Sequence, residues 1–314
     1  MNEAGVRVAL PFAVLIAILA VSTASVLIRF AQAAAPSLVI AALRLTCATL
    51  LLAPLALTRH RAELGSLTRK ELTLGAIAGM FLAVHFATWI SSLEYTSVAS
   101  SVVFVSTGPL WVTLLSPVLL NERLTRAAIL GLVIAILGGT LIGLSDACTW
   151  KGGLQCLELS QVIQGRAVWG NFLALAGAWT VSGYLIIGRK LRMARSISLI
   201  PYIFLVYGMS AIALIVIMFA AGQSPLGYPP RTYGWIFLLA AFPQLIGHST
   251  YNWALRYLPA TLVAIITLIE PIGSAILAYL ILQETPANAV LLGGVLILVG
   301  IYLASRPRSV RLAA

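Results

Sequence analysis

A glutamate and a proline stand side by side near the middle of a long apolar run, in the segment 268-LIEPIG-273. The run extends from about residue 258 to 282, which is long enough to cross a bilayer. A carboxylate at its centre costs roughly 2.5–3.5 kcal/mol on insertion scales, and Pro271 clashes with the carbonyl of Thr267 and removes a helix hydrogen bond. Ionisable residues inside spans mark substrate or ion sites, or they pair with one another. Glu270 therefore predicts either a binding group or one half of a buried ion pair.

Arg44 is the candidate partner for Glu270, because it is a basic residue placed inside an apolar run. At a rise of 1.5 Å per residue, Glu270 and Arg44 lie about 12 and about 10 Å from the same membrane edge. If the two residues form a structural ion pair, removal of one member should lower the stability of the folded protein by about 3–5 kcal/mol. In the functional interpretation, Glu270 binds the amino group of a substrate or takes up a proton, since desolvation disfavours a charged carboxylate. The sequence leaves both interpretations open.

The composition predicts that lipid covers most of the surface. Of the 314 residues, 61% are hydrophobic and 9% are charged, with a mean hydropathy of +1.01, whereas soluble domains carry about 25% charged residues. The net charge of +11 does not indicate nucleic-acid binding, because the basic residues lie in short loops between apolar runs. Cys47, Cys148 and Cys156 have no metal-ligand spacing, so neither a metal nor a cofactor is expected.

Ten apolar runs are each about 20 residues long, as a transmembrane helix requires. They cover residues 8–28, 37–57, 72–93, 97–120, 127–145, 168–188, 199–221, 233–253, 258–282 and 287–305. Fifteen of the twenty lysines and arginines fall on one side of this arrangement, and Arg29, Lys151, Arg166 and Arg231 fall on the other. The positive-inside rule then places both termini in the cytoplasm of a multi-pass protein of the bacterial inner (plasma) membrane.

The chain contains an internal repeat. Residues 93–138 and 255–300 align without a gap, so that Pro109 meets Pro271 and Glu122 meets Glu284. Gly131 likewise meets Gly293, and Gly138 meets Gly300. Each half therefore holds five spans, and an odd number inverts the second half in the membrane. Inverted repeats are typical of secondary transporters, which bind their substrates near the midplane.

The predicted first repeat covers residues 1–145 and the second covers residues 168–305. Between them lies a predicted periplasmic linker, 146–167, and a cytoplasmic tail, 306–314, ends the chain. The linker holds Cys148 and Cys156, which would either form a disulfide in an oxidising compartment or remain two free thiols.

The paired modules, each with a proline followed thirteen residues later by a glutamate, resemble the EamA branch of the drug/metabolite transporter superfamily. The resemblance covers nearly the whole chain. It implies an all-α membrane fold of ten transmembrane helices, arranged as two inverted five-helix repeats around a central cavity. It also implies export of amino acids or other small metabolites, without specifying which.

Polar and aromatic residues recur at helical spacing on spans 1, 3, 4, 6, 8 and 9, and such stripes should face away from lipid. The predicted substrate-binding residues are His85, Trp89, Ser101, Thr107, Trp111, Trp179, Ser182, Gln244, His248, Tyr251, Asn252, Thr267, Glu270 and Ser274. Serine and threonine in a span also bond to their own helix carbonyls, so several of these residues have a structural alternative. Histidines can bridge helices, and tryptophans can pack or anchor at the interface.

Backbone features complete this picture. Pro109 and Pro271 are predicted helix breaks that either widen a cavity and allow bending or are static kinks. Spans 5 and 10 carry glycines instead of polar stripes, which predicts close helix packing.

The sequence thus predicts a secondary transporter that exports small metabolites by alternating access around a midplane cavity. Few inward charges suit amino acids or related amphipathic solutes, and a P-loop motif for ATP is absent from the sequence. The expected partners are a small-molecule substrate and the lipid bilayer; proton coupling is left open, and the protein is expected to be a monomer. A channel or facilitator is the alternative. An intramembrane enzyme is a second alternative. His85 and His248 are its nearest candidate residues, but their predicted depths differ by about 10–12 Å, which is too far for them to share a metal.

Overall fold

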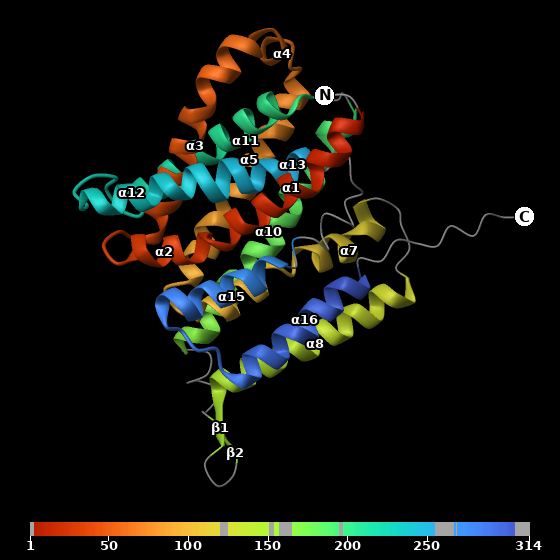
Figure 1. Ribbon diagram of the computed structural model, residues 1–314, viewed down its shortest axis with the longest axis vertical. Helices are drawn as coiled ribbons and strands as arrows, with labels where there is room; N and C mark the ends of the chain where they lie inside the picture. The colour runs from red at the N-terminus through yellow and green to blue at the C-terminus, as the bar shows by residue number, and fades with distance from the viewer. Residues whose placement is uncertain are drawn as a thin grey trace, which may run out of the picture.

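The computed structural model describes residues 3–119, 125–150, 154–156, 165–194, 197–254, 267 and 269–304. Within these ranges the regular secondary structure is helical except for one short hairpin (Figure 1). Five of the described helical segments are long and apolar enough to cross a membrane: Phe12–Gln32, Ser37–Arg59, Arg69–Ser92, Arg166–Gly188 and Leu199–Ala220. Shorter apolar helices occur at Val98–Val112, Arg126–Ile142, Ile269–Leu282 and Asn288–Ala304.

The first half contains the expected five spans, two of them broken. Its helices are α1 (Glu3–Ser22), α2 (Ala24–Gln32), α3 (Ser37–Arg59), α4 (Arg61–Gly65), α5 (Arg69–Ser92), α6 (Val98–Val105), α7 (Gly108–Leu119) and α8 (Arg126–Ala147). The first span is interrupted at Thr23, and the fourth at Ser106–Thr107, just before Pro109. The break predicted at Pro109 is therefore present, because proline cannot donate the hydrogen bond that would continue the helix.

The second half has the same order of spans. Its helices are α10 (Arg166–Ala194), α11 (Leu199–Ala220), α12 (Pro230–Leu239), η1 (Ala240–His248), α13 (Ser249–Ala254), α15 (Ile269–Leu282) and α16 (Asn288–Ala304). The beginning of the predicted span 258–282, together with Glu122 and the tail 306–314, lies outside the described residues.

The eighth span is not the regular helix that its hydropathy predicts. Residues Ala240–His248 form a π-helix, η1, with Pro243 inside it. A proline lacks the N–H that an α-helix needs and clashes with the carbonyl four residues earlier, that of Leu239. A widened π turn accommodates this defect, and such turns occur frequently at functional sites.

The two halves meet through equivalent glycines of α8 and α16, which lie side by side (Figure 1). A Cβ atom added to Gly138 would lie 2.5 Å from the carbonyl oxygen of Gly293, and one added to Gly300 would lie 2.5 Å from that of Gly131. Since residue 131 faces 300 and residue 138 faces 293, the two helices run antiparallel. They occupy equivalent places in the repeat, so their opposite directions confirm the predicted inversion of the second half.

The same approximate two-fold relation recurs at the other contacts between the halves. The third span, α5, packs against the sixth, α10, and the first span, α1, packs against the eighth at η1. The second and seventh spans, α3 and α11, also pack together. Each half therefore completes the core of the other, and the interface between the halves runs through the middle of the bundle.

A hairpin follows α8. Strands β1 (Cys148–Trp150) and β2 (Leu154–Cys156) pair antiparallel, and Cys148 stands directly opposite Cys156 in the register. Opposite positions in an antiparallel pair have Cα atoms about 4.5–5.5 Å apart, within the span of a disulfide.

We expect these two cysteines to form a disulfide when the hairpin is exported to an oxidising compartment. Alkylation of the denatured, unreduced protein should then add a single label, at Cys47, and alkylation after reduction should add three. Mass spectrometry distinguishes the two results. Three labels without reduction would contradict both the disulfide and its expected compartment.

Candidate functional site

Arg44 on α3 is the deepest charge in the described structure, with 0% of its surface exposed. Its Nε donates a hydrogen bond to Oε1 of Gln244 on η1 at 3.1 Å, and its Cζ lies 4.2 Å from the ring centre of Phe86 on α5. The two terminal nitrogens, Nη1 and Nη2, have no hydrogen-bond partner among the described residues. A buried guanidinium with two free groups is costly, which sets Arg44 apart from an ordinary structural residue.

Two histidines pack around the same phenylalanine. His85 Nδ1 lies 2.9 Å from the carbonyl oxygen of Gly177, and because a carbonyl can only accept, the ring nitrogen donates. The His85 ring lies 4.8 Å from Phe86 and stacks on Trp89 at 5.9 Å, while His248 meets Phe86 edge-on at 5.7 Å. The halves thus bring together the two histidines from α5 and η1, with Phe86 between them.

Glu270, in the first turn of α15, is half-buried and interacts electrostatically with Arg44 and Tyr251. It does not form a direct ion pair with Arg44: among the described residues, no nitrogen of Arg44 lies within 4.0 Å of a Glu270 oxygen. The Glu270 carboxylate and the Arg44 guanidinium therefore interact electrostatically without direct contact.

These side chains form one group, which we call the mid-span polar cluster. It consists of Arg44, His85, Phe86, Trp89, Gln244, His248, Tyr251 and Glu270. Its members come from α3 and α5 in the first half and from η1, α13 and α15 in the second. Phe86 carries no polar signal in the sequence, and its role depends on the rotation of α5 toward α3 and η1.

Several other predicted site residues connect helices. The hydroxyl of Ser182 donates to the Gly108 carbonyl at 2.9 Å, and that of Ser274 donates to the Ser22 carbonyl at 3.2 Å. The first bond joins α10 to α7 and the second joins α15 to α1, which are equivalent helix pairs in the two halves. These serines hold the broken spans against their neighbours.

The remaining predicted residues take structural positions. Ser101 shares a hydrogen bond of 2.6 Å with Ser92, and Thr107 donates to the carbonyl of Phe104 at 2.7 Å. Asn252 bonds to Tyr184 and to the His248 carbonyl, Thr267 and Trp111 are half-buried, and Pro271 is buried in α15.

Trp179 does not join the mid-span polar cluster. It is 52% exposed on the face of α10 that also carries Phe172, seven residues earlier. Ser182 is buried, and Trp179 lies about 60° away from it around a helix of 3.6 residues per turn. In the sequence, Trp179 and Ser182 are three residues apart, a spacing that fits one broad helix face, so this difference was not visible there.

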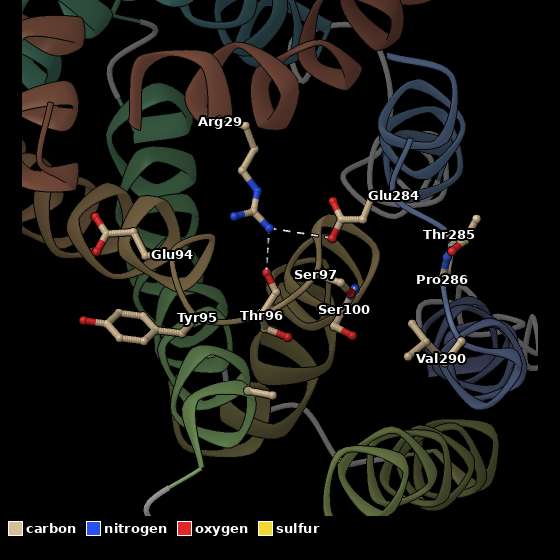
Figure 2. A pocket seen from close by; sticks show the side chains of 12 residues that line it. Arg29, Glu94, Tyr95, Thr96, Ser97, Ser100, Glu284, Thr285, Pro286 and Val290 are labelled. Carbon is tan, nitrogen blue, oxygen red and sulfur yellow. Dashed lines mark hydrogen bonds and ion pairs between the residues drawn. The ribbon is translucent and has the colours of Figure 1, made fainter. Parts of the chain in front are cut away.

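A pocket of about 460 Å³ lies at one end of the bundle, the end that the basic residues predict to be extracytoplasmic. Figure 2 shows Arg29 and Glu284 pointing toward one another across it. Arg29 Nη2 donates to the carbonyl of Thr96 at 3.0 Å and lies 3.6 Å from Glu284 Oε1, which accepts the Val98 N–H at 2.9 Å.

We call Arg29, Thr96, Val98 and Glu284 the end latch, because they join α2 and the start of α6 in the first half to the loop before α16 in the second. In the sequence, Arg29 is only a topology signal and Glu284 only a matched position of the internal repeat. Their contact could not be read from the sequence, since 255 residues separate them.

We expect Arg29→Gln to loosen this end of the protein. In a variant with its native cysteines replaced by serine, a cysteine introduced at Ser100, which is 1% exposed and lines the pocket, should be labelled several-fold faster by a membrane-impermeant maleimide. The matched control is Arg231→Gln, an arginine that stacks on Trp235 outside the latch. Equal labelling rates in the two variants would contradict the latch.

Two halves of apolar helices, related by inversion and joined around buried charges, are typical of membrane transporters. Residues 10–144 and 168–306 each match the EamA-like transporter family, and the chain belongs to this family. It is a multi-pass membrane transporter with two EamA units, and not an enzyme.

Similar proteins carry the same general description. An "uncharacterized transporter" of Archaeoglobus fulgidus is 22% identical over 235 residues, covering 74% of this chain and 75% of its own. The "uncharacterized transporter YyaM" of Bacillus subtilis is 22% identical over 225 residues, covering 70% and 68%. A solved crystal structure shares the fold with a TM-score of 0.63 at 20% identity, covering 94% of this chain and 96% of that one.

Proposed function

We propose that the protein exports amino acids or related amphipathic solutes across a bacterial inner membrane, by alternating access around the mid-span polar cluster. The observation that carries this proposal is the pair of opposite charges, Arg44 and Glu270, which come from different halves and do not touch. Opposite charges held apart among aromatic rings suit a solute that has both charges and an apolar body. A polyanion would require several inward cations instead.

The end latch supports a mechanism for access. Its ion pair and hydrogen bonds hold the two halves together at the predicted extracytoplasmic end. Export requires this end to open while the opposite end closes, and the interrupted spans provide places to bend at Thr23, before Pro109 and in η1. Glu270 is the group best placed to exchange a proton during this cycle.

The membrane orientation remains part of the proposal. The distribution of basic residues supports cytoplasmic termini, a first repeat over 1–145, a periplasmic linker over 146–167 and a second repeat over 168–305. The function is proposed for a monomer, because each chain contains both halves.

Counterflow in reconstituted liposomes tests the function. Vesicles loaded with unlabelled L-leucine, L-phenylalanine or L-threonine should accumulate the same labelled amino acid transiently and saturably. Liposomes without protein provide the control, and nucleosides and organic cations test other solute classes. Flux that neither saturates nor responds to internal solute would indicate a channel, and counterflow restricted to another class would contradict the proposed substrates.

A further inference from the structure

We infer that Arg44 binds the carboxylate of the transported solute while Glu270 binds its amino group, so that the substrates are free α-amino acids rather than amines or amides. This inference rests on the proposed function and narrows it. It begins from the hydrogen-bonding groups of the mid-span polar cluster that have no partner.

In the mid-span polar cluster, most side-chain groups without a hydrogen-bond partner among the described residues can only donate, and the Tyr251 hydroxyl can also accept. Among the described residues they include Nη1 and Nη2 of Arg44 and the indole Nε1 of Trp89, which can only donate. Arg44 lies over the Phe86 ring, and the ring centres of Trp89 and Phe86 are 6.3 Å apart. Among the described residues this concentration of buried donors lacks an acceptor, and the ligand that completes it is an anion.

The orientation of Arg44 narrows the anion further. Its Nε is already bonded to Gln244 at 3.1 Å, and Phe86 supports the flat face of the guanidinium. The edge that remains carries Nη1 and Nη2 together, and this fork donates hydrogen bonds to the two oxygens of a carboxylate. The protein's own nearby carboxylate, Glu270, does not fill this position, because the two side chains are more than 4.0 Å apart.

Glu270 supplies the complementary half of the site. It lies in the first turn of α15 and interacts electrostatically with Arg44 and with Tyr251. An ammonium group bound there would lie between Glu270 and the carboxylate on Arg44, and the charges of ligand and site would cancel. An amine without a carboxylate would leave the Arg44 donors unpaired, which is the kind of mismatch that discriminates strongly between ligands.

The wild-type protein provides the first test, by thermal shift and competition in detergent. The probes are L-leucine, L-leucinamide and isoamylamine, with the same acid and amide pairs for phenylalanine and threonine. We expect the amide and the amine to bind at least tenfold more weakly than the amino acid that binds best. Equal affinities for acid and amide would overturn the inference while leaving transport of amino-acid-like solutes intact.

Variants provide the second test. Arg44→Gln should reduce the ratio of acid to amide affinity to about one, and Arg44→Lys should restore part of it, because lysine keeps the charge but not the fork. Arg231→Gln, which alters an arginine over Trp235, is the matched control and should keep the ratio. An unchanged ratio in folded Arg44→Gln would overturn the inference, and the ligand series on the wild type decides the matter if that variant does not fold. Binding of nucleosides or organic cations alone would instead overturn the proposed function itself.

Discussion

Leucine in place of Gly138 is expected to prevent the two halves from packing, and even alanine there should destabilise the folded protein by about 1–3 kcal/mol. A Cβ at this position would lie 2.5 Å from the Gly293 carbonyl oxygen and 2.9 Å from Cβ of Leu296. Both are parts of α16 that cannot rotate away, so the helices must separate. In a membrane, close packing of small residues is a main source of helix association, and separation therefore loses much of the interface.

The neighbouring glycine supplies the control for this prediction. A Cβ at Gly139 would meet the Phe104 ring at 3.4 Å, which is an ordinary contact, and the substitution has the same effect on helix propensity. Melting temperatures of the purified Gly138→Ala and Gly139→Ala variants should differ by several degrees, and Gly138→Leu should elute as aggregate in size exclusion. Equal melting temperatures for the two alanine variants would show that α8 and α16 do not approach as closely as described.

The sequence could predict this interface because its glycines occupy matching positions in the two repeats. The coincidence of Gly131 with Gly293 and of Gly138 with Gly300 indicated duplication, and the same four glycines make the antiparallel contact. Duplication, span number and inversion depend on hydropathy and spacing, which are local properties. These features of the fold could therefore be predicted from the sequence.

The site was less accessible, because it depends on how the helices rotate. Hydropathy placed Arg44 and Glu270 at similar depth, but only the packing of α3 against η1 gives Arg44 its bond to Gln244. Phe86 is apolar, so its place in the cluster had no polar signal in the sequence. Trp179 was predicted to line the cavity, but it lies about 60° away from buried Ser182 around α10. The π-helix had a visible sign in Pro243, but proline alone does not distinguish a kink from a widened turn.

Serine and threonine show a further limit of polar stripes. Ser182 and Ser274 fit the pattern of a binding face, yet each hydroxyl bonds to a carbonyl of an adjacent helix. Serine and threonine hydroxyls can donate to the carbonyls of broken helices or can bind solutes. A polar stripe alone therefore does not distinguish these two roles. Charged residues separate them better, because their burial is costly and demands a specific compensation.

Replacement of Glu270 by glutamine is expected to reduce counterflow at least a hundredfold and to flatten its dependence on pH between about 5.5 and 8.5. Glutamine keeps the shape of the side chain but can neither carry the charge that attracts an ammonium group nor exchange a proton at these pH values. The ionisable groups that act on Glu270 electrostatically are Arg44 and Tyr251. The measurement is counterflow in liposomes across this pH range, with Glu71→Gln at the exposed start of α5 as the matched control.

Thermal stability of the same variant decides between the two interpretations that the sequence left open. A structural ion pair with Arg44 would lose about 3–5 kcal/mol on substitution, and the protein would melt at a much lower temperature. Since no nitrogen of Arg44 lies within 4.0 Å of a Glu270 oxygen, we expect instead a melting temperature within a few degrees of the wild type. A folded Glu270→Gln protein that transports normally, with its pH profile intact, would remove Glu270 from the mechanism.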